Sequence, residues 1–596
     1  MRRVLEAHAA FRLPRGLQPE RVQWLYDGAA ATAATSSSAA ADAHLLYWMQ
    51  TSVRAKYNYA LEYAIAAANA LAVPLRVVYV LADRAAAPAG SADPNAWGFA
   101  TARHAKFGLE GLLAAHQRLR QRGVQLYVLH QRAQSRERLL RRCARGAALV
   151  VTDRPYLRPW REALDACAAA AAAEPTRWGL VQVEGDVVVP CEVASDKEEY
   201  AARTIRPRIT RQLPKFLVEL EHLEVSGAAR SDDDSAAATW LASLAADDDD
   251  GADDDALALA ALDVSGATPL NALLAPLDVD RSVRGVAAFT GGEAVAVAVA
   301  KRFLETKLLK YADERNEPSG DGGSNLSLYL RFGHISPVRV ALAAHKVAGG
   351  AGGALRAGRD AFLEELIVRR ELAVNMAVFN PRHYDAYACL PPFATATLAA
   401  HADDPRAHVY SRAQLEAAAT GDVYWNAAQR ELVATGAMHG YMRMYWGKKI
   451  LEWTASPQEG YAAALALNNK YSLDAPDPNS YAGVAWTFGK HDQGWKERPI
   501  FGKVRYMNEA GLKRKFRMDA YVRKAQLLAR AYGADPADED GDSGEPGAEG
   551  VATARKASGG AERKRTTLES FWGAGGNKDG AKATTSATKA KKAKKQ

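Results

Sequence analysis

Three tryptophans in one short stretch are the residues of this sequence best suited to redox chemistry. Trp446 and Trp453 are seven residues apart, so a helix would place them on one face, two turns apart. Trp425 lies on the preceding segment, beyond a break at Gly436. Indole is the most easily oxidised of the ordinary side chains, so a buried row of three could pass an electron inward from the surface. The plainer interpretation of the spacing is an aromatic stripe that faces a core.

The stretch around these tryptophans resembles the class II cyclobutane pyrimidine dimer (CPD) photolyases. Those sequences carry WNAxQ and then MHGxxRMYWxKKILEW, a pattern that residues 425–453 reproduce. The order continues in further blocks, which are ASDKEEYAARTIRPRI (194–209), SNLSLYLRFGHIS (324–336), FLEELIVRRELAVN (362–375), YSLDAPDPNSY (471–481), HDQGW (491–495) and FGKVRYM (501–507). Because many blocks recur in the same order, together they identify the family more specifically than any single block does.

The resemblance implies light-dependent DNA repair with FAD as the cofactor. Photoexcited reduced FAD passes one electron to a flipped-out dimer and splits it into two pyrimidines, while Trp425, Trp446 and Trp453 form the electron-transfer path. The residues that the resemblance implies for FAD binding are Tyr311, Ser324, Asn325, Leu326, Ser327, Leu328, Asn468, Asp474 and Asp477. Asn468 matches the position that faces the redox-active nitrogen of the flavin, where an amide can bond to the protonated or the unprotonated ring.

The resemblance also implies a pocket for the lesion. Its catalytic residues are Glu365, Met444, Trp486 and Asn468: the carboxyl group bonds to the pyrimidine edges, and the thioether and indole form an apolar wall. The residues that it implies for DNA binding are Arg315, Asn316, Trp495 and Arg505. The expected partner is therefore DNA that contains cyclobutane pyrimidine dimers. The plainer interpretation of Glu365 is a surface carboxylate paired with nearby Arg369.

Some positions depart from the family pattern. Leu328 and Arg331 stand where relatives carry proline and histidine, and Ala475 and Pro476 stand where they carry glycine and arginine. These changes bear on flavin affinity and leave two other functions open. A photoreceptor of the cryptochrome kind would keep FAD and the tryptophans without repair, whereas a DNA-binding scaffold would lack the flavin. The joint presence of the lesion-pocket residues favours the repair enzyme.

Composition limits the class of protein. A chain of 596 residues with ordinary apolar content predicts two or three globular domains, with no membrane role. The formal net charge of +8 weakly favours a polyanionic partner. The four cysteines are scattered without a CxxC pair, so we expect a reducing compartment and no metal site.

The elements that must position these residues divide the chain into four parts. Strand and helix patterns alternate over residues 21–205, at strands near 44–49, 75–81, 124–129, 147–152 and 181–189 and at helices 59–71 and 107–121. We predict a Rossmann-like α/β (antenna) domain there, with a parallel sheet. Residues 206–283 are expected to be a linker with a solvated acidic insertion, and residues 284–534 an all-α FAD-binding catalytic domain.

Residues 535–596 have the composition of a disordered basic tail. Within it, Leu568, Phe571 and Trp572 resemble the sliding-clamp-binding box of repair proteins, and the lysine-rich end resembles a nuclear address. We therefore expect a nuclear protein, with the chloroplast or mitochondrion as alternatives. We also expect a monomer. The resemblance leaves open a deazaflavin-type antenna in the N-terminal domain.

Overall fold

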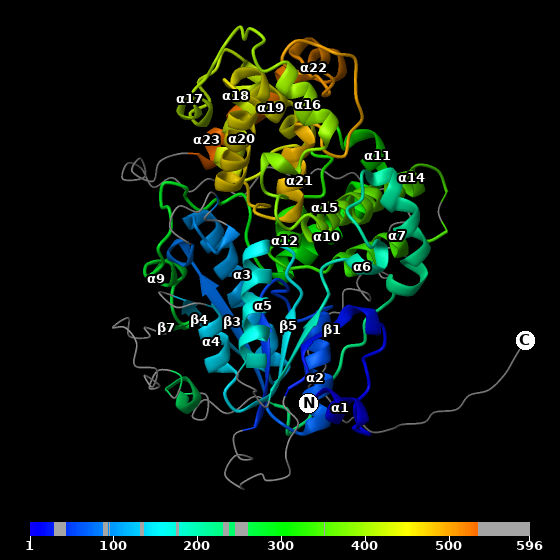
Figure 1. Ribbon diagram of the computed structural model, residues 1–596, viewed down its shortest axis with the longest axis vertical. Coiled ribbons are helices and arrows are strands. Elements are labelled where there is room, and N and C mark those ends of the chain that lie inside the picture. The colour runs from blue at the N-terminus through cyan, green and yellow to red at the C-terminus, as the bar shows by residue number, and fades with distance from the viewer. Residues whose placement is uncertain are drawn as a thin grey trace, which may run out of the picture. The chain divides into compact units, whose positions relative to one another are not determined.

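The computed structural model describes residues 1–28, 43–87, 93, 96–131, 136–173, 178–230, 238–242, 244, 260–350 and 352–533. One compact unit takes in Met1–Glu549. Within it, an N-terminal α/β part (blue to cyan in Figure 1) packs against a helical part (green to orange). The predicted clamp box at Leu568, Phe571 and Trp572 and the basic tail lie outside the described residues and stay predictions.

The α/β part is built on a seven-stranded sheet in the order β1-β6-β5-β2-β3-β4-β7. Its strands are β1 Val22–Tyr26, β2 His44–Met49, β3 Leu75–Ala82, β4 Gln125–Gln131, β5 Ala147–Asp153, β6 Gly179–Val183 and β7 Ala260–Leu262. The five central strands pair in parallel, and β1 and β7 lie antiparallel at the two edges. In this order, β3 and β4 follow β2 on one side, and β6 follows β5 on the other, so the chain order reverses at the β2–β5 pair. The carboxyl ends of that pair are therefore the place where open α/β sheets bind ligands.

Helices cover both faces of the sheet, which is why its central strands read as continuous apolar runs. These helices are α2 Tyr59–Leu71, α3 Ala102–Gln121, α4 Arg136–Cys143 and α5 Arg158–Ala173. Helix α2 has the predicted bounds, because Asn58 caps its first turn and Ala72 ends it at a φ of 52°. Helix α3 begins earlier than predicted, since the Thr101 side chain accepts a hydrogen bond from the His104 amide.

Two expectations for this part of the chain were wrong. The strand predicted over 181–189 ends at Val183, and the next residues turn away so that Asp186 can meet polar partners. The acidic insertion was expected to be solvated, yet Trp240 and Leu244 are buried in the α/β core. The Trp240 ring packs 4.9 Å from that of Tyr127. Burial of one indole and one leucine offsets much of the cost of ordering a single turn. Further along the chain, β7 adds an edge strand beside β4.

The helical part contains no strand between residues 284 and 533, apart from undescribed residue 351. Its main helices are α10 Glu293–Thr306, α12 Ser327–Arg331, α13 Pro337–Ala348, α14 Gly353–Leu363, η5 Glu364–Arg369, α15 Arg370–Phe379, α16 Pro392–Ala400, α18 Val423–Thr435, α19 Gly440–Trp453, α20 Pro457–Tyr471, α21 Pro478–Thr487, α22 Glu509–Lys515 and α23 Met518–Tyr532. Two helices before them, α6 Cys191–Ala194 and α7 Ala202–Phe216, lead out of the sheet. Across the described ranges, the helices are too short or too polar to span a bilayer. All four cysteines are buried thiols.

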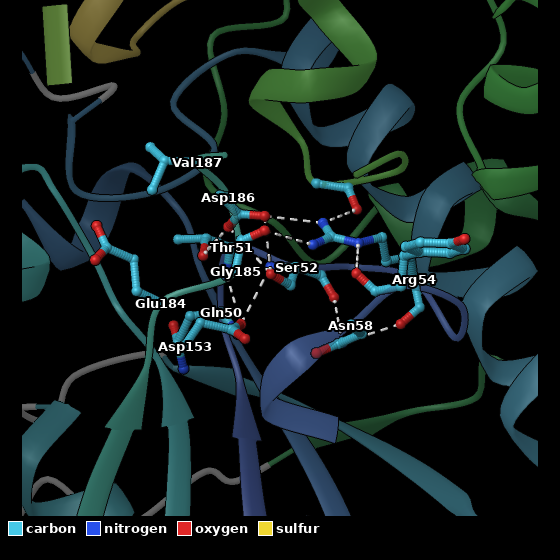
Figure 2. A network of polar contacts seen from close by, with 12 residues as sticks. Gln50, Thr51, Ser52, Arg54, Asn58, Asp153, Glu184, Gly185, Asp186 and Val187 are labelled. Carbon is cyan, nitrogen blue, oxygen red and sulfur yellow. Dashed lines mark hydrogen bonds and ion pairs between the residues drawn. The ribbon is translucent and has the colours of Figure 1, made fainter. Parts of the chain in front are cut away.

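A buried polar network closes the carboxyl ends of β2 and β5 (Figure 2). The Asp153 carboxylate accepts hydrogen bonds from the backbone amides of Gln50, Thr51 and Ser52 at 2.8–3.1 Å. Asp186 accepts from the Ser52 hydroxyl and forms a 2.9 Å ion pair with Arg54. Burial raises the pKa of Asp186, but the Arg54 guanidinium and nearby hydroxyls outweigh it and hold that pKa below its ordinary value.

We predict that Asp186→Asn destabilises the protein strongly. The Arg54 side chain is 0% exposed, so the substitution leaves a buried guanidinium without its counter-charge. The free energy of unfolding should fall by about 3 kcal/mol. As a matched control, Asp278→Asn removes one partner of the exposed Arg84–Asp278 pair and should cost less than about 1 kcal/mol. Thermal and urea unfolding of both variants measure the difference, and an equal loss in the two would contradict the prediction.

Candidate active site

The tryptophan stretch forms two consecutive helices joined at a glycine. Asp422 caps α18, because its carboxylate accepts hydrogen bonds from the amides of Tyr424 and Trp425. Gly436 ends α18 at a φ of 72°, as the predicted break requires. The His439 ring then accepts from the Tyr441 amide and starts α19. The turn folds the two helices back on each other and brings the three indoles together.

Trp425 lies between the other two tryptophans. Its ring stacks on that of Trp446 at 6.2 Å and 4°, and meets that of Trp453 edge-on at 5.7 Å. All three are 5% exposed or less, so they also belong to a core, as the plainer interpretation expected. The two inner indoles are fixed by hydrogen bonds: Trp425 Nε1 donates to the Trp446 carbonyl, and Trp446 Nε1 donates to Gln429 Oε1.

Tyr410 continues this row toward the surface, which the sequence did not predict. Its ring meets that of Trp453 at 5.3 Å, and the exposed His408 stacks on its other side at 6.1 Å. Tyr410 precedes Trp425 by 15 residues and lies in a segment without helical periodicity. No spacing rule links it to the tryptophans. The row therefore runs from His408 and Tyr410 through Trp453 and Trp425 to Trp446.

A charged pair lies beside this row, at one end of α20. Arg443 on α19 forms an ion pair with Asp474 at 3.1 Å, and the Ser472 hydroxyl donates to the same carboxylate at 2.7 Å. Burial raises the pKa of Asp474, but Arg443 and the hydroxyls of Ser472 and Ser327 outweigh it and lower that pKa below its ordinary value. Asp474 is therefore an anion at neutral pH. Asp477 instead caps α21 through the amide of Asn479.

Asn468 is buried and its amide is oriented by a relay of hydrogen bonds. The Asp93 carboxylate can only accept, so the group that Asn469 places 2.6 Å from it is the NH₂. The Asn469 carbonyl oxygen then accepts from the NH₂ of Asn468 at 3.1 Å. The carbonyl oxygen of Asn468 is thereby turned away from Asn469. The family resemblance pointed to Asn468, whose role stays a prediction, but it did not point to Asn469 or to Asp93, which comes from the α/β part.

The residues expected to hold FAD phosphates do not share one environment. Ser324, Asn325 and Ser327 are partly or fully exposed polar residues at the start of α12. Leu326 and Leu328 are buried at 1% and 2% exposure, so their side chains serve the core. Tyr311 is buried in a cluster with Phe303 and Phe362. The Arg315 guanidinium lies 6.0 Å from the centroid of its ring.

Glu365 lies in a π-helical turn, η5, and pairs with a residue other than the one expected. Its partner is Arg315 at 2.5 Å, whereas Arg369 pairs with Glu364 at 3.3 Å. In a π-helix residues five apart share a face, which brings Arg369 to Glu364. The Arg315 carbonyl is in turn bonded to the His439 ring at 3.0 Å. Arg315 therefore links Glu365 to the start of α19, the helix that carries Met444.

Met444 and Trp486 are half-buried on two neighbouring helices, α19 and α21. Gly483 lies one turn before Trp486, and a Cβ placed on it would meet nothing within 4 Å. Space is therefore open beside α21, although α15, α19 and α20 all pack against that helix.

Two further predicted residues, Trp495 and Arg505, stack on each other at the surface; we call this pair the Trp495 step. The Trp495 ring is 45% exposed, and the Arg505 guanidinium lies 4.4 Å from its centroid. Arg505 is held there by a 2.9 Å ion pair with Asp492. Asn316, the remaining residue predicted to bind DNA, is exposed.

A second candidate site lies at the carboxyl ends of β2 and β5. A cavity of about 110 Å³ opens there between the two parts of the chain. Aromatic residues line it, together with Arg331 and Gln50; these aromatics are Tyr79, Phe99, Tyr156, Trp160 and Phe332. Both polar atoms of the Gln50 amide are buried without a hydrogen-bond partner among the described residues. The cavity therefore has unused polar groups between aromatic walls.

Arg136 packs behind Trp160, one of the residues that line this cavity, and it is the least satisfied charge near it. Its guanidinium stacks on Trp160 at 3.5 Å, and none of its three nitrogens meets an acceptor within the described part of the chain. Burial lowers its pKa to about 9, so it still carries a charge at neutral pH. A buried unpaired cation is costly, which points to an anionic ligand that would complete the site.

Known proteins resemble this chain in sequence and in fold. The DNA photolyase family model matches residues 45–225. A deoxyribodipyrimidine photo-lyase of Methanothermobacter thermautotrophicus is 45% identical over 81% of this chain and 95% of its own. The enzyme of that name from Arabidopsis thaliana is 38% identical over 81% and 89%.

Solved structures share the fold at low identity. An archaeal photolyase from Sulfolobus tokodaii with two FAD molecules has a TM-score of 0.54 at 14% identity and covers 89% of this chain and 99% of its own. A Synechocystis cryptochrome has a TM-score of 0.55 at 14% identity and covers 82% and 87%. These likenesses confirm the predicted fold class, a Rossmann-like α/β part joined to a helical part.

We predict that Arg136→Met raises the Tm of protein freed of bound small molecules. Methionine keeps most of the apolar contact with Trp160 and removes a buried charge that has no partner. The gain in stability should be about 1–3 kcal/mol. Arg54→Met, at a buried arginine that is paired, should lower the Tm instead. If Arg136→Met lowers the Tm as Arg54→Met does, Arg136 supports the fold and no ligand need be invoked.

Proposed function

The chain belongs to the DNA photolyase family, and we propose that the site on its helical part repairs cyclobutane pyrimidine dimers in DNA with light. The curated relatives named deoxyribodipyrimidine photo-lyase cover 81% of the chain, and the chain spans 95% and 89% of them. The predicted family, activity and enzyme class are confirmed by this membership. The assignment to class II stays a prediction. The likeness to a cryptochrome is one of fold alone, so it does not favour the photoreceptor alternative.

FAD is the cofactor of this activity, and the helical part has features that fit it. The open space beside Gly483 is a cradle among packed helices. The neighbouring helices α19 and α20 carry Arg443, which pairs with Asp474, and the oriented Asn468 amide, and these groups supply charge and hydrogen bonds. When bound and reduced, FAD supplies the photoexcited electron that splits the dimer. We propose that Arg443, Asp474 and Asn468 hold its ring, while Ser324 and Ser327 bind the phosphates.

In this proposal the Asn468 amide has a defined polarity. Because its NH₂ is engaged by Asn469, the carbonyl oxygen is the group left to face the cofactor. A carbonyl oxygen accepts hydrogen bonds, so it favours a protonated ring nitrogen. The remaining N–H of the same NH₂ can still donate, and Asp93 keeps both amides from flipping. Asp93 is therefore a positioning residue that acts through Asn469.

The tryptophan row is proposed to bring reducing equivalents to the cofactor. Ring contacts connect His408 and Tyr410 near the surface with Trp446, one turn beyond Arg443 on α19. Hydrogen bonds hold Trp425 and Trp446, and all three indoles are 5% exposed or less. A fixed and dry row limits reorganisation when an electron moves along it.

The lesion is proposed to enter beside Glu365. The structural observation that carries this proposal is the Arg315 bridge, which ties the Glu365 carboxylate to His439 and thus to α19. Glu365 is 39% exposed, so it can release Arg315 and turn to the polar edge of a pyrimidine. Met444 and Trp486 then supply the apolar wall.

We further propose that the cavity at the sheet holds the deazaflavin-type antenna. Its walls are aromatic and it holds the unpaired Gln50 amide, which suits a planar ligand that carries polar groups. The unpaired Arg136 guanidinium behind the wall residue Trp160 would favour an anionic group on that ligand. The same Arg136→Met variant bears on this proposal. Purified from cells that make the chromophore, it should lose the antenna absorption band while it keeps the FAD band, and an unchanged spectrum would contradict the proposal.

We predict that Glu365→Ala lowers the quantum yield of repair at saturating dimer DNA by about tenfold or more. Loss of one hydrogen bond to a charged group in a water-poor pocket costs about 1.5–3 kcal/mol. Glu364→Ala is the matched control, since Glu364 pairs with Arg206 and Arg369 instead. FAD content should be unchanged in both variants. A wild-type yield in Glu365→Ala would remove this carboxylate from the active site.

We predict that Trp425→Phe blocks photoreduction of the oxidised cofactor by an external donor. Phenylalanine fills most of the indole volume but is much harder to oxidise, and Trp425 contacts both other tryptophans. Chemically prereduced variant should repair dimers at nearly the wild-type yield. Trp178→Phe, in the core of the α/β part, serves as the control and should photoreduce normally. Rapid photoreduction of Trp425→Phe would rule out the proposed row.

A further inference from the structure

Helix α7 presents an unusually basic surface next to the active site. It carries five cations and no carboxylate; the cations are Arg203, Arg206, Arg208, Arg211 and Lys215. Its apolar residues Ile205, Ile209 and Phe216 are buried, so they anchor the opposite face. All five cations are at least partly exposed. The helix therefore holds a stripe of positive charge at its surface.

Three of these cations pair with a carboxylate of the described residues, and two do not. Arg206 pairs with Glu364 at 2.7 Å, Arg208 pairs with Glu199 at 3.0 Å, and Lys215 pairs with Glu20. Arg203 and Arg211 are exposed and have no carboxylate partner among the residues that the structure describes. Arg203 lies only over the ring of Tyr200, at 5.9 Å. These two guanidinium groups are therefore available to an outside anion.

The start of α7 is tied to the loop that carries Trp495. The Tyr200 hydroxyl donates to the Asp492 carbonyl at 2.7 Å, and the His491 ring lies 2.8 Å from the Tyr200 carbonyl. Asp492 in turn holds Arg505, which stacks on Trp495. Tyr200 itself is 43% exposed, so a second large aromatic ring adjoins this step.

The middle of α7 is tied to the other side of the site. The Arg206–Glu364 pair joins it to η5, whose next residue is Glu365. Helix α7 also lies beside α6 (Figure 1). The basic stripe of α7 thus extends from the Trp495 step to the π-helical turn that carries Glu365. In that position it could contact DNA on one side of a bound dimer.

We infer that Arg203 and Arg211 bind backbone phosphates of the DNA that flanks the lesion. This inference rests on the proposed function and extends its DNA footprint beyond the pocket. The two residues are eight apart, about 12 Å along the helix, a length over which one strand of B-DNA carries about three phosphates. Exposed guanidinium groups without counter-charges suit phosphate oxygens in geometry and charge. The contacts position the duplex and carry no sequence preference.

Salt dependence of binding provides the test. We would measure the affinity of FAD-loaded protein for a dimer-containing duplex between 50 and 200 mM salt, for wild type and for Arg203→Gln/Arg211→Gln. Each phosphate contact contributes about 0.9 to the slope of log K against log salt, so the double variant should lose about 1.8 from that slope. Repair yield at saturating DNA should stay at the wild-type value, because neither residue touches the pocket. Arg211→Gln alone should lose about half as much.

A matched control distinguishes direct phosphate contacts from long-range electrostatic attraction of DNA to the protein. Arg3→Gln/Arg120→Gln removes the same charge from exposed residues on helices α1 Arg2–Ala7 and α3 of the α/β part, and should leave the slope unchanged. An unchanged slope in the α7 variant, or an equal loss in the control, would overturn the inference. The proposed function fails separately, if the wild-type protein binds dimer-containing DNA no better than undamaged DNA.

Discussion

One buried guanidinium holds the two helices of the active site in place. Arg103, on α3 of the α/β part, donates to the carbonyls of Leu432 and Val433 at the end of α18 and of Tyr471 at the end of α20. These carbonyls lie in the last turns of their helices, where they carry the negative end of the helix dipole. The Leu432 carbonyl also accepts the hydrogen bond from the Gly436 amide that ends α18. Burial lowers the pKa of Arg103 to about 10, so the group remains charged at neutral pH. The C-terminal ends of α18, which carries Trp425, and of α20, which carries Asn468, are therefore both bound by the Arg103 side chain.

Contacts of the same kind join the two parts elsewhere. Arg54 pairs with Asp186 and also donates to the Gly333 carbonyl of the helical part. Glu371 on α15 accepts from the amides of Val188 and Val189, and burial raises its pKa to about 8. Each of these buried groups has polar partners. The helical part therefore receives a fixed orientation from the sheet, which the relay from Asp93 to Asn468 requires.

The sequence predicted what depends on local spacing and missed what depends on distant partners. The bounds of α2, the break at Gly436 and the meeting of three tryptophans followed from periodicity and helix ends. Trp240 was missed because its burial depends on Tyr127, which no local pattern reveals. Glu365 was found by family resemblance, but its partner was not, because a π-helical turn shifts the facing residue from four to five positions away. Arg103 meets carbonyls more than 300 residues away, which no spacing rule can anticipate.

The satisfaction of buried polar groups separates structural residues from functional ones in this protein. Arg54, Arg103 and Glu371 are buried, and their polar groups meet partners within the chain. Arg136 is equally buried, yet it has none among the described residues. A fold gains nothing from such a group, since an apolar side chain of similar size would be more stable there. Its presence is better explained by a ligand that completes it, and the same reasoning at the surface sets Arg203 and Arg211 apart from the paired cations of α7. In both places, the missing partner is an anion that the described part of the chain does not supply.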